Sequence, residues 1–250
     1  MLPTLLTFLA TFGAALALER MAHRRLQEVC ILLVRNVDLA TALYSVVLLP
    51  GVALHEASHA LMAALLGVRV RRLSLRPERQ RSGTIRLGYV EVLRSDTLRS
   101  SLIGAAPLFA GLAALLVIGM LVFDLEAVQL AVSEVSLAAL VDALLALPRA
   151  TDSWLWIYLV FAIANSMMPS ASDVQAWPAL IAGLALIGTA TLVLGGAPAL
   201  AAFAPLALGA LRWLTATFLL TAFINLLAVL AMGLVAGVVG ALTGRRVEFR

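Results

Sequence analysis

Long runs of apolar residues, interrupted by few charges, limit most strongly how this chain can fold. Such runs occupy about residues 2–19, 39–66, 102–123, 154–194 and 206–240. Each reaches the roughly 18 to 25 residues that a helix needs to cross the hydrocarbon layer, and 154–194 is long enough for two crossings. Only 13% of the residues are charged, against about 25% in soluble domains. We therefore expect an all-α polytopic membrane protein with about six transmembrane helices.

The organisation of the chain is expected to be simple. The first run lacks a basic start and an evident small-residue cleavage site, which favours a retained span over a signal peptide. No repeat or low-complexity linker divides the sequence, so we expect a single membrane domain over residues 1–250. Cys30 is the only cysteine, which excludes an internal disulfide and a thiolate zinc cluster.

The net charge of +4 is distributed unevenly, which in a membrane protein reports orientation rather than a nucleic-acid partner. Segment 69–99 and the tail 245–250 are basic, whereas 124–152 is mostly acidic. The positive-inside rule then predicts a multi-pass protein of the cell membrane with a cytoplasmic C-terminus. Segment 20–37 disagrees, because it carries four arginines and the crossing count places it outside. Either it lies at the interface as an amphipathic segment, or the first span is miscounted.

One polar insertion, residues 69–93, interrupts the apolar pattern. Apolar residues alternate on either side of the breaker cluster PERQRSG, which predicts a cytoplasmic β-hairpin. The alternative is a plain basic loop. Gly88 interrupts the second strand, where a bulge would explain the shift of apolar parity to Val90 and Val92.

Residues 51–67, GVALHEASHALMAALLG, set three ionisable side chains inside an apolar run. On a helix, His55 and His59 lie one turn apart on one face, where both imidazoles can bind one metal ion. Zinc lowers the pKa of a bound water to about 7, and Glu56, beside the first ligand, can then act as general base in peptide hydrolysis. The alternative is a pair of core histidines satisfied by backbone and serine groups, but ionisable residues in a span are costly.

A catalytic zinc normally has a third protein ligand. His23 lies in the basic segment 20–25, where we expect a solvated interface residue rather than a ligand. Asp173 ends the stretch NSMMPSASD and is the best candidate, since it is the only acid between Asp152 and Glu248. Its alternative role is the N-cap of the helix that follows.

HEASH and the later N-x-x-x-P-x-x-x-D segment resemble the site-2-protease-like intramembrane zinc metalloproteases over about residues 39–190. The resemblance implies one Zn²⁺ per chain, held by His55, His59 and Asp173, with Glu56 as base. It also implies a substrate or oxyanion contact for Asn165, which stands eight residues before the aspartate as in that family.

The chain departs from the family pattern at three places. Pro169 follows Asn165 by four residues instead of three, Val174 stands where the family has glycine, and GAAPLFAG (104–111) lacks the asparagine of a G-P-x-x-N element. By itself, a buried Asn165 equally suits a helix–helix hydrogen bond. Gly51 and the alanines around HEASH predict that a neighbouring helix approaches closely.

The expected function is an intramembrane zinc metalloendopeptidase that hydrolyses peptide bonds of membrane proteins within or near their transmembrane segments. Such an enzyme must admit water and unwind its substrate, and an exposed hairpin edge can hold the extended substrate by β-augmentation. The alternative is a catalytically silent relative that binds partners as a regulator or chaperone. Glu56 argues against it, whereas the altered aspartate region supports it. Transport fits poorly, because no two halves carry matched broken helices.

Overall fold

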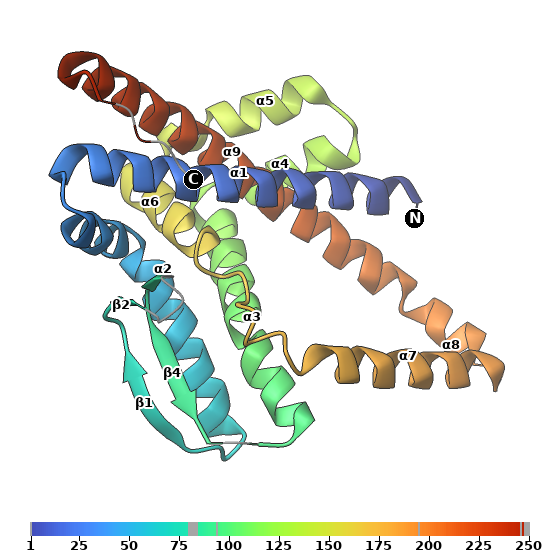
Figure 1. The fold of residues 1–250 in the computed structure, drawn as a ribbon. Coiled ribbons are helices and arrows are strands. Elements are labelled where there is room, and N and C mark those ends of the chain that lie inside the picture. Colours follow the sequence, from blue (N-terminus) through green and yellow to red (C-terminus); the bar gives the residue numbers. More distant parts are fainter. Residues whose placement is uncertain (1, 80–84, 94, 195, 246, 248–250) are drawn as a thin grey trace.

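Long apolar helices dominate the computed structural model, which describes all residues except 1, 80–84, 94, 195, 246 and 248–250 (Figure 1). Within the described residues, four helices are long and apolar enough to cross a membrane: α1 (Leu2–Val34), α2 (Val37–Leu65), α3 (Thr97–Val122) and α9 (Ala204–Thr243). The shorter helices are α4 (Leu125–Ser133), α5 (Leu137–Leu145), the 3-10 turn η1 (Leu147–Arg149), α6 (Ser153–Ala164), α7 (Trp177–Val193) and α8 (Ala197–Ala202). An all-α, membrane-like architecture is confirmed, with four candidate spans rather than the expected six.

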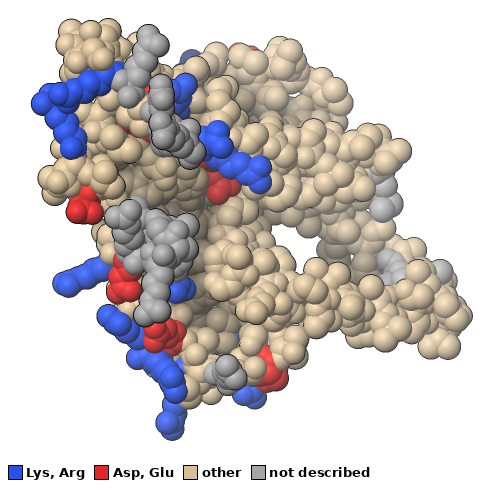
Figure 2. All heavy atoms as spheres, in the orientation of Figure 1, with Lys and Arg blue, Asp and Glu red and all other residues tan. Residues whose placement is uncertain are grey.

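The difference in span count arises mainly between residues 153 and 194. The expected pair of spans is divided by an irregular segment, 165–176, which leaves α6 and α7 as apolar helices shorter than a full crossing. Asn165 is the C-cap of α6, and Pro169 lies within the irregular segment. α7 buries none of its residues and extends away from the other helices with α8 (Figure 1). Its apolar, uncharged surface is visible on the right of Figure 2.

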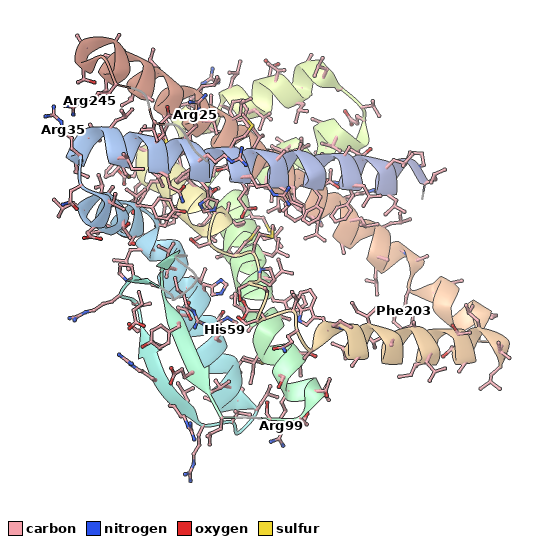
Figure 3. All side chains as sticks on the ribbon, viewed as in Figure 1. Arg25, Arg35, His59, Arg99, Phe203 and Arg245 are labelled. Atoms are coloured by element: carbon pink, nitrogen blue, oxygen red, sulfur yellow. The ribbon has the colours of Figure 1, made fainter. Side chains whose placement is uncertain are left out.

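α1 is one continuous helix through the polar stretch that was expected to be separate. It runs beside α9 in the same direction, because Phe8 and Phe12 contact Phe218 near one end while Arg25 and Arg245 line a common hollow near the other. Figure 3 shows Arg25 and Arg245 toward the C-terminal ends of α1 and α9. Residues 20–34 therefore lie at the same end of the helix pair as the C-terminal end of α9, whereas the crossing count placed segment 20–37 and the C-terminal tail on opposite sides.

The predicted hairpin is present as two short antiparallel ladders. β1 (Val70–Ser74) pairs with β4 (Tyr89–Val92), and β2 (Glu78–Arg79) pairs with β3 (Ile85–Arg86). Part of the breaker cluster, residues 80–83, lies outside the described residues. The bulge is on the other strand from the one expected, because Arg71 is the extra residue between Val70 and Arg72. At Gly88 the ladder is interrupted instead, where β4 meets α2.

α2, α3 and α6 pack together and form the frame that carries HEASH. A side chain at Gly51 of α2 would meet the carbonyl oxygen of Ala162 in α6 at 2.0 Å, so only glycine permits this approach. The close helix approach predicted at this position is confirmed. Leu48 and Leu115 are fully buried beside it, in the core that links these helices to α1 and α9. The frame thus holds α2 rigidly from two sides.

Candidate functional site

The site begins with one turn of α2. Asn36 caps the start of this helix, accepting hydrogen bonds from the N–H groups of Asp38 and Leu39, and the chain leaves it through Gly67 at φ 69°. Although Pro50 lies inside α2, the helix continues to Leu65, and His55 and His59 face the same side, as predicted. Their rings meet edge to face with centroids 4.9 Å apart, and their Nε2 atoms lie 3.2 Å apart. Figure 3 shows His59 between α2, α3 and the hairpin.

Two main-chain carbonyls orient the imidazoles. Nδ1 of His55 lies 2.6 Å from the carbonyl oxygen of Ser166, and Nδ1 of His59 lies 2.8 Å from that of Ile103. A carbonyl only accepts, so in the neutral rings both protons are on Nδ1 and both Nε2 lone pairs point toward each other. Two facing lone pairs repel unless a cation lies between them. The rings are therefore prepared for a metal ion.

Asp173 completes the group, although it comes from the irregular segment. Its Oδ1 lies 3.4 Å from Nε2 of His59, and its Oδ2 lies 3.8 Å from Nε2 of His55. Oδ2 also accepts hydrogen bonds from the N–H and the hydroxyl of Ser170, both at 2.7 Å, which fix the carboxylate. The helix after it begins only at Trp177 with Ala176 as N-cap, so the alternative role as N-cap is wrong.

The three ligand atoms are close enough together to hold one metal ion. They all lie within 4.8 Å of one another. Two ligands on one tetrahedral zinc, each at about 2.0–2.1 Å, lie about 3.3 Å apart. Two of the three pairs here are close to this value, at 3.2 and 3.4 Å, and the pair between Asp173 Oδ2 and Nε2 of His55 is longer, at 3.8 Å. Two imidazoles and one carboxylate are also a donor set that catalytic zinc accepts, with a fourth position left open. His55, His59 and Asp173 can thus hold a metal ion.

Glu56 lies beside this group against the hairpin. Its side chain is buried, and a Cβ at Gly88 would lie 2.9 Å from its Cγ, so glycine at this point lets the hairpin approach the carboxylate. A cavity of about 450 Å³ opens here. It is lined by the three candidate ligands, by Glu56, Arg86 and Val90, and by the segment around Asp173. The cavity brings the acidic side chain, the candidate ligands and strand β4 to one space.

The glycines of GAAPLFAG seat the irregular segment on α3. A Cβ at Gly104 would lie 2.1 Å from the carbonyl oxygen of Asp173, and one at Gly111 would lie 2.5 Å from Cβ of Met167. The sequence element with small residues is therefore what allows the aspartate to reach the histidines. Its spacing was the signal available for this role, and the chain lacks only the asparagine of the family element.

Asn165 makes the helix–helix hydrogen bond that the sequence left open. Its Nδ2 donates to the carbonyl of Phe161 at 2.8 Å and to Oδ1 of Asn225 in α9 at 2.7 Å. Both amide protons are thereby used, while Oδ1 is buried without a partner among the described residues. A catalytic role for Asn165 stays a prediction, and in this arrangement the free atom is an acceptor rather than an oxyanion donor.

His23 lies closer to the site than a solvated interface residue would. Its Nδ1 is 2.6 Å from the hydroxyl of Tyr44, and the ring is half-buried. It lies outside the group of candidate metal ligands, as expected. It instead lines a second hollow that also touches His55 and Glu56, a position that the basic sequence around it concealed.

Comparison of the chain with protein-family models, with curated proteins and with solved structures finds no match. The resemblance to the site-2-protease-like enzymes therefore rests on the residues of the two motifs.

Proposed function

We propose that this chain is an integral membrane zinc metalloendopeptidase that cleaves membrane proteins within or near their transmembrane segments. One observation carries the proposal: two histidines with facing Nε2 lone pairs and a fixed carboxylate converge beside a buried glutamate in an open cavity. His55, His59 and Asp173 hold the zinc, one ion per chain. A cytoplasmic C-terminus is proposed with it, on the distribution of arginines alone.

Zinc held at this site would polarise the substrate carbonyl and acidify water. Glu56 accepts a proton from the attacking water and passes it to the amine nitrogen of the departing peptide. Its burial against Gly88 fixes the carboxylate next to His55. Ser166 and Ile103 keep the imidazoles in the tautomer with a free Nε2. A non-enzyme would have no use for this glutamate, which favours catalysis over a silent partner-binding relative.

Strand β4 offers a place for an extended substrate. Leu93 donates its N–H to Arg69 beside β1, so the alternation of an antiparallel strand turns the N–H of Val90 to the other edge. Val90 and Val92 also line the cavity. A substrate segment unwound from its helix can pair along this edge by β-augmentation, which brings its backbone to the metal group.

Elemental analysis of the purified protein and cleavage of a model membrane substrate test the proposal together. The parent protein should hold zinc near one per chain, His55→Ala should lose it, and His23→Ala should keep it. Glu56→Gln should retain zinc while kcat falls by about 10²–10⁴-fold, and the same change at the exposed Glu126 of α4 should leave cleavage intact. Zinc retained by the parent without any cleavage would favour the silent relative. Full activity in Glu56→Gln would refute the mechanism.

A further inference from the structure

A second hollow, of about 300 Å³, reaches the site from the α1 side. It is lined by Glu19 and His23 of α1, by Leu87 of the hairpin and by Asn165, Ser166 and Met168 at the end of α6. His55 and Glu56 line both this hollow and the larger cavity beside Asp173. Arg86 and Gly88 of the hairpin segment line both spaces as well, so the two spaces border each other at the turn of α2 that carries the reactive groups.

Two residues that line this hollow each have one buried polar atom without a partner among the described residues. These atoms are Oδ1 of Asn165, a residue only 4% exposed, and Oγ of Ser166. Their orientation is determined, since the amide nitrogen of Asn165 is engaged by Phe161 and Asn225. Buried polar atoms are almost always hydrogen-bonded to protein or ordered water. A polar space of this size holds several waters, each occupying about 30 Å³.

The outer end of the hollow is polar as well. Glu19 and His23 lie one helical turn apart on α1, with Oε1 of Glu19 3.9 Å from Nε2 of His23. Both side chains remain partly exposed, at 14% and 28%, and Tyr44 holds the histidine ring through its hydroxyl. Polar groups thus extend from the exposed end of the hollow to the buried atoms beside Glu56.

We propose that this hollow is a hydrated passage that supplies water to Glu56 from the α1 side while the substrate occupies the larger cavity. Each cleavage consumes one water, whose oxygen and one hydrogen join the new carboxyl group while the other hydrogen goes to the new amine. A peptide paired along β4 would cover the larger cavity, so replacement water needs another route. The use in turnover rests on the proposed function, whereas the hydration of the hollow does not.

Single cysteines can report this hydration, since Cys30 is the only native cysteine and is buried. In a Cys30→Ala background, Met168→Cys places a thiol on the hollow, and Met167→Cys, 4% exposed against Gly111, is the matched control. The probe is a small, charged, membrane-impermeant thiosulfonate, applied to protein in liposomes opened to both sides. We expect Met168→Cys to react and Met167→Cys to stay unmodified.

A second pair of changes locates the entrance. Glu19→Leu with His23→Leu should slow the modification of Met168→Cys about tenfold, roughly the effect of one lost hydrogen bond to water. Glu28→Leu with Arg25→Leu, the ion pair further along α1, should leave the rate unchanged. The proposed passage would be refuted if Met168→Cys did not react, or if the changes at Glu19 and His23 left its rate of modification unaltered.

The role in turnover is read separately on the protein with Met168 intact. Closing the entrance with Glu19→Leu and His23→Leu should lower kcat with KM and bound zinc unchanged, because neither residue is a candidate ligand or lines the cavity proposed for the substrate. A rise in KM at constant kcat would instead make the hollow a substrate subsite and refute the passage. If the parent protein cleaves nothing, the proposed function fails while the thiol measurements still decide whether the hollow is hydrated.

Discussion

α2 and the irregular segment 165–176 contribute to the same candidate metal centre by different means. The part of α2 after Pro50 is helical, and the helical spacing alone aligns His55 and His59. The irregular segment contributes Asp173 and the carbonyl of Ser166, whose positions depend on contacts with Gly51 and Gly104 of neighbouring helices. A helix can thus specify ligands through its own geometry, whereas an irregular segment specifies them only through the surfaces on which it rests.

The largest expected effect is on zinc affinity. It distinguishes the ligand Asp173 from Ser170, which supports it within the irregular segment. Asp173→Ala should lower zinc affinity by more than about 100-fold, and Ser170→Ala, which removes one of the two donors to Oδ2, by about 10–100-fold. Competition with a chelator of known affinity measures both. Equal zinc affinity in the parent and in Asp173→Ala would mean that α2 alone makes the metal site.

Gly104→Ala tests whether the contact of the irregular segment with α3 is as important for the site as the ligand Asp173. A Cβ there would lie 2.1 Å from the carbonyl of Asp173, so we expect a loss of about 1–3 kcal/mol in the free energy of unfolding, together with weaker zinc binding. Gly13→Ala is the control, because a Cβ at Gly13 has no atom within 4 Å. Thermal unfolding in detergent with and without zinc gives both quantities. Equal stability and equal zinc binding in Gly104→Ala and Gly13→Ala would mean that the contact at Gly104 does not position the irregular segment.

Val90→Pro tests the wall of the cavity that faces both regions. Proline removes the N–H that we expect to pair with a substrate strand, so cleavage of a model substrate should fall about tenfold, whereas zinc content stays near one per chain. Val90→Ala keeps the N–H and should retain most of the activity. If proline and alanine give equal rates in folded protein, substrate does not pair with β4.

The smallest expected effect lies at the start of α3. The backbone N–H of Arg99 donates to Asp96 and lowers the pKa of this exposed carboxyl below its ordinary value of 3.8. Because the folded pKa is the lower one, the stabilisation is complete above about pH 4 and is lost as the pH falls through the folded pKa. The unfolding temperatures of the parent and Asp96→Asn should therefore differ slightly at pH 7 and converge as the pH falls below the folded pKa of Asp96. A constant difference would assign the effect to shape rather than charge.

The sequence predicted the parts of the site that depend on periodicity or rarity. His55 and His59 share a helix face, and Asp173 was distinctive as an isolated acid in an apolar region. Ser166 and Ile103 escaped prediction because they act through main-chain carbonyls, which have no residue signature. The position of Glu19 and His23 escaped because it depends on how α1 crosses α2.

The fold was predictable to a similar extent. The hairpin followed from its alternating pattern, but its bulge lies at Arg71 because the register depends on both strands. The apolar run 154–194 had the length of two spans, yet residues 165–176 leave the helix to reach the histidines. The length and hydropathy of this run do not show that its middle must pack against α2 and α3. The basic stretch 20–34 stayed helical because Ala22, Leu26 and Cys30 are buried on one face.

The parallel pairing of α1 with α9 also bears on how the molecule assembles. Among the described residues this is the most extensive contact between two helices, and it joins the first helix of the sequence to the last. Contacts between distant parts of a chain form slowly, because a long loop must close before they are made. The contact between α1 and α9 can therefore form only after α9 has been synthesised. We expect a chain released before Ala204 to be a target for quality-control proteases, even though it already contains every residue of the metal centre.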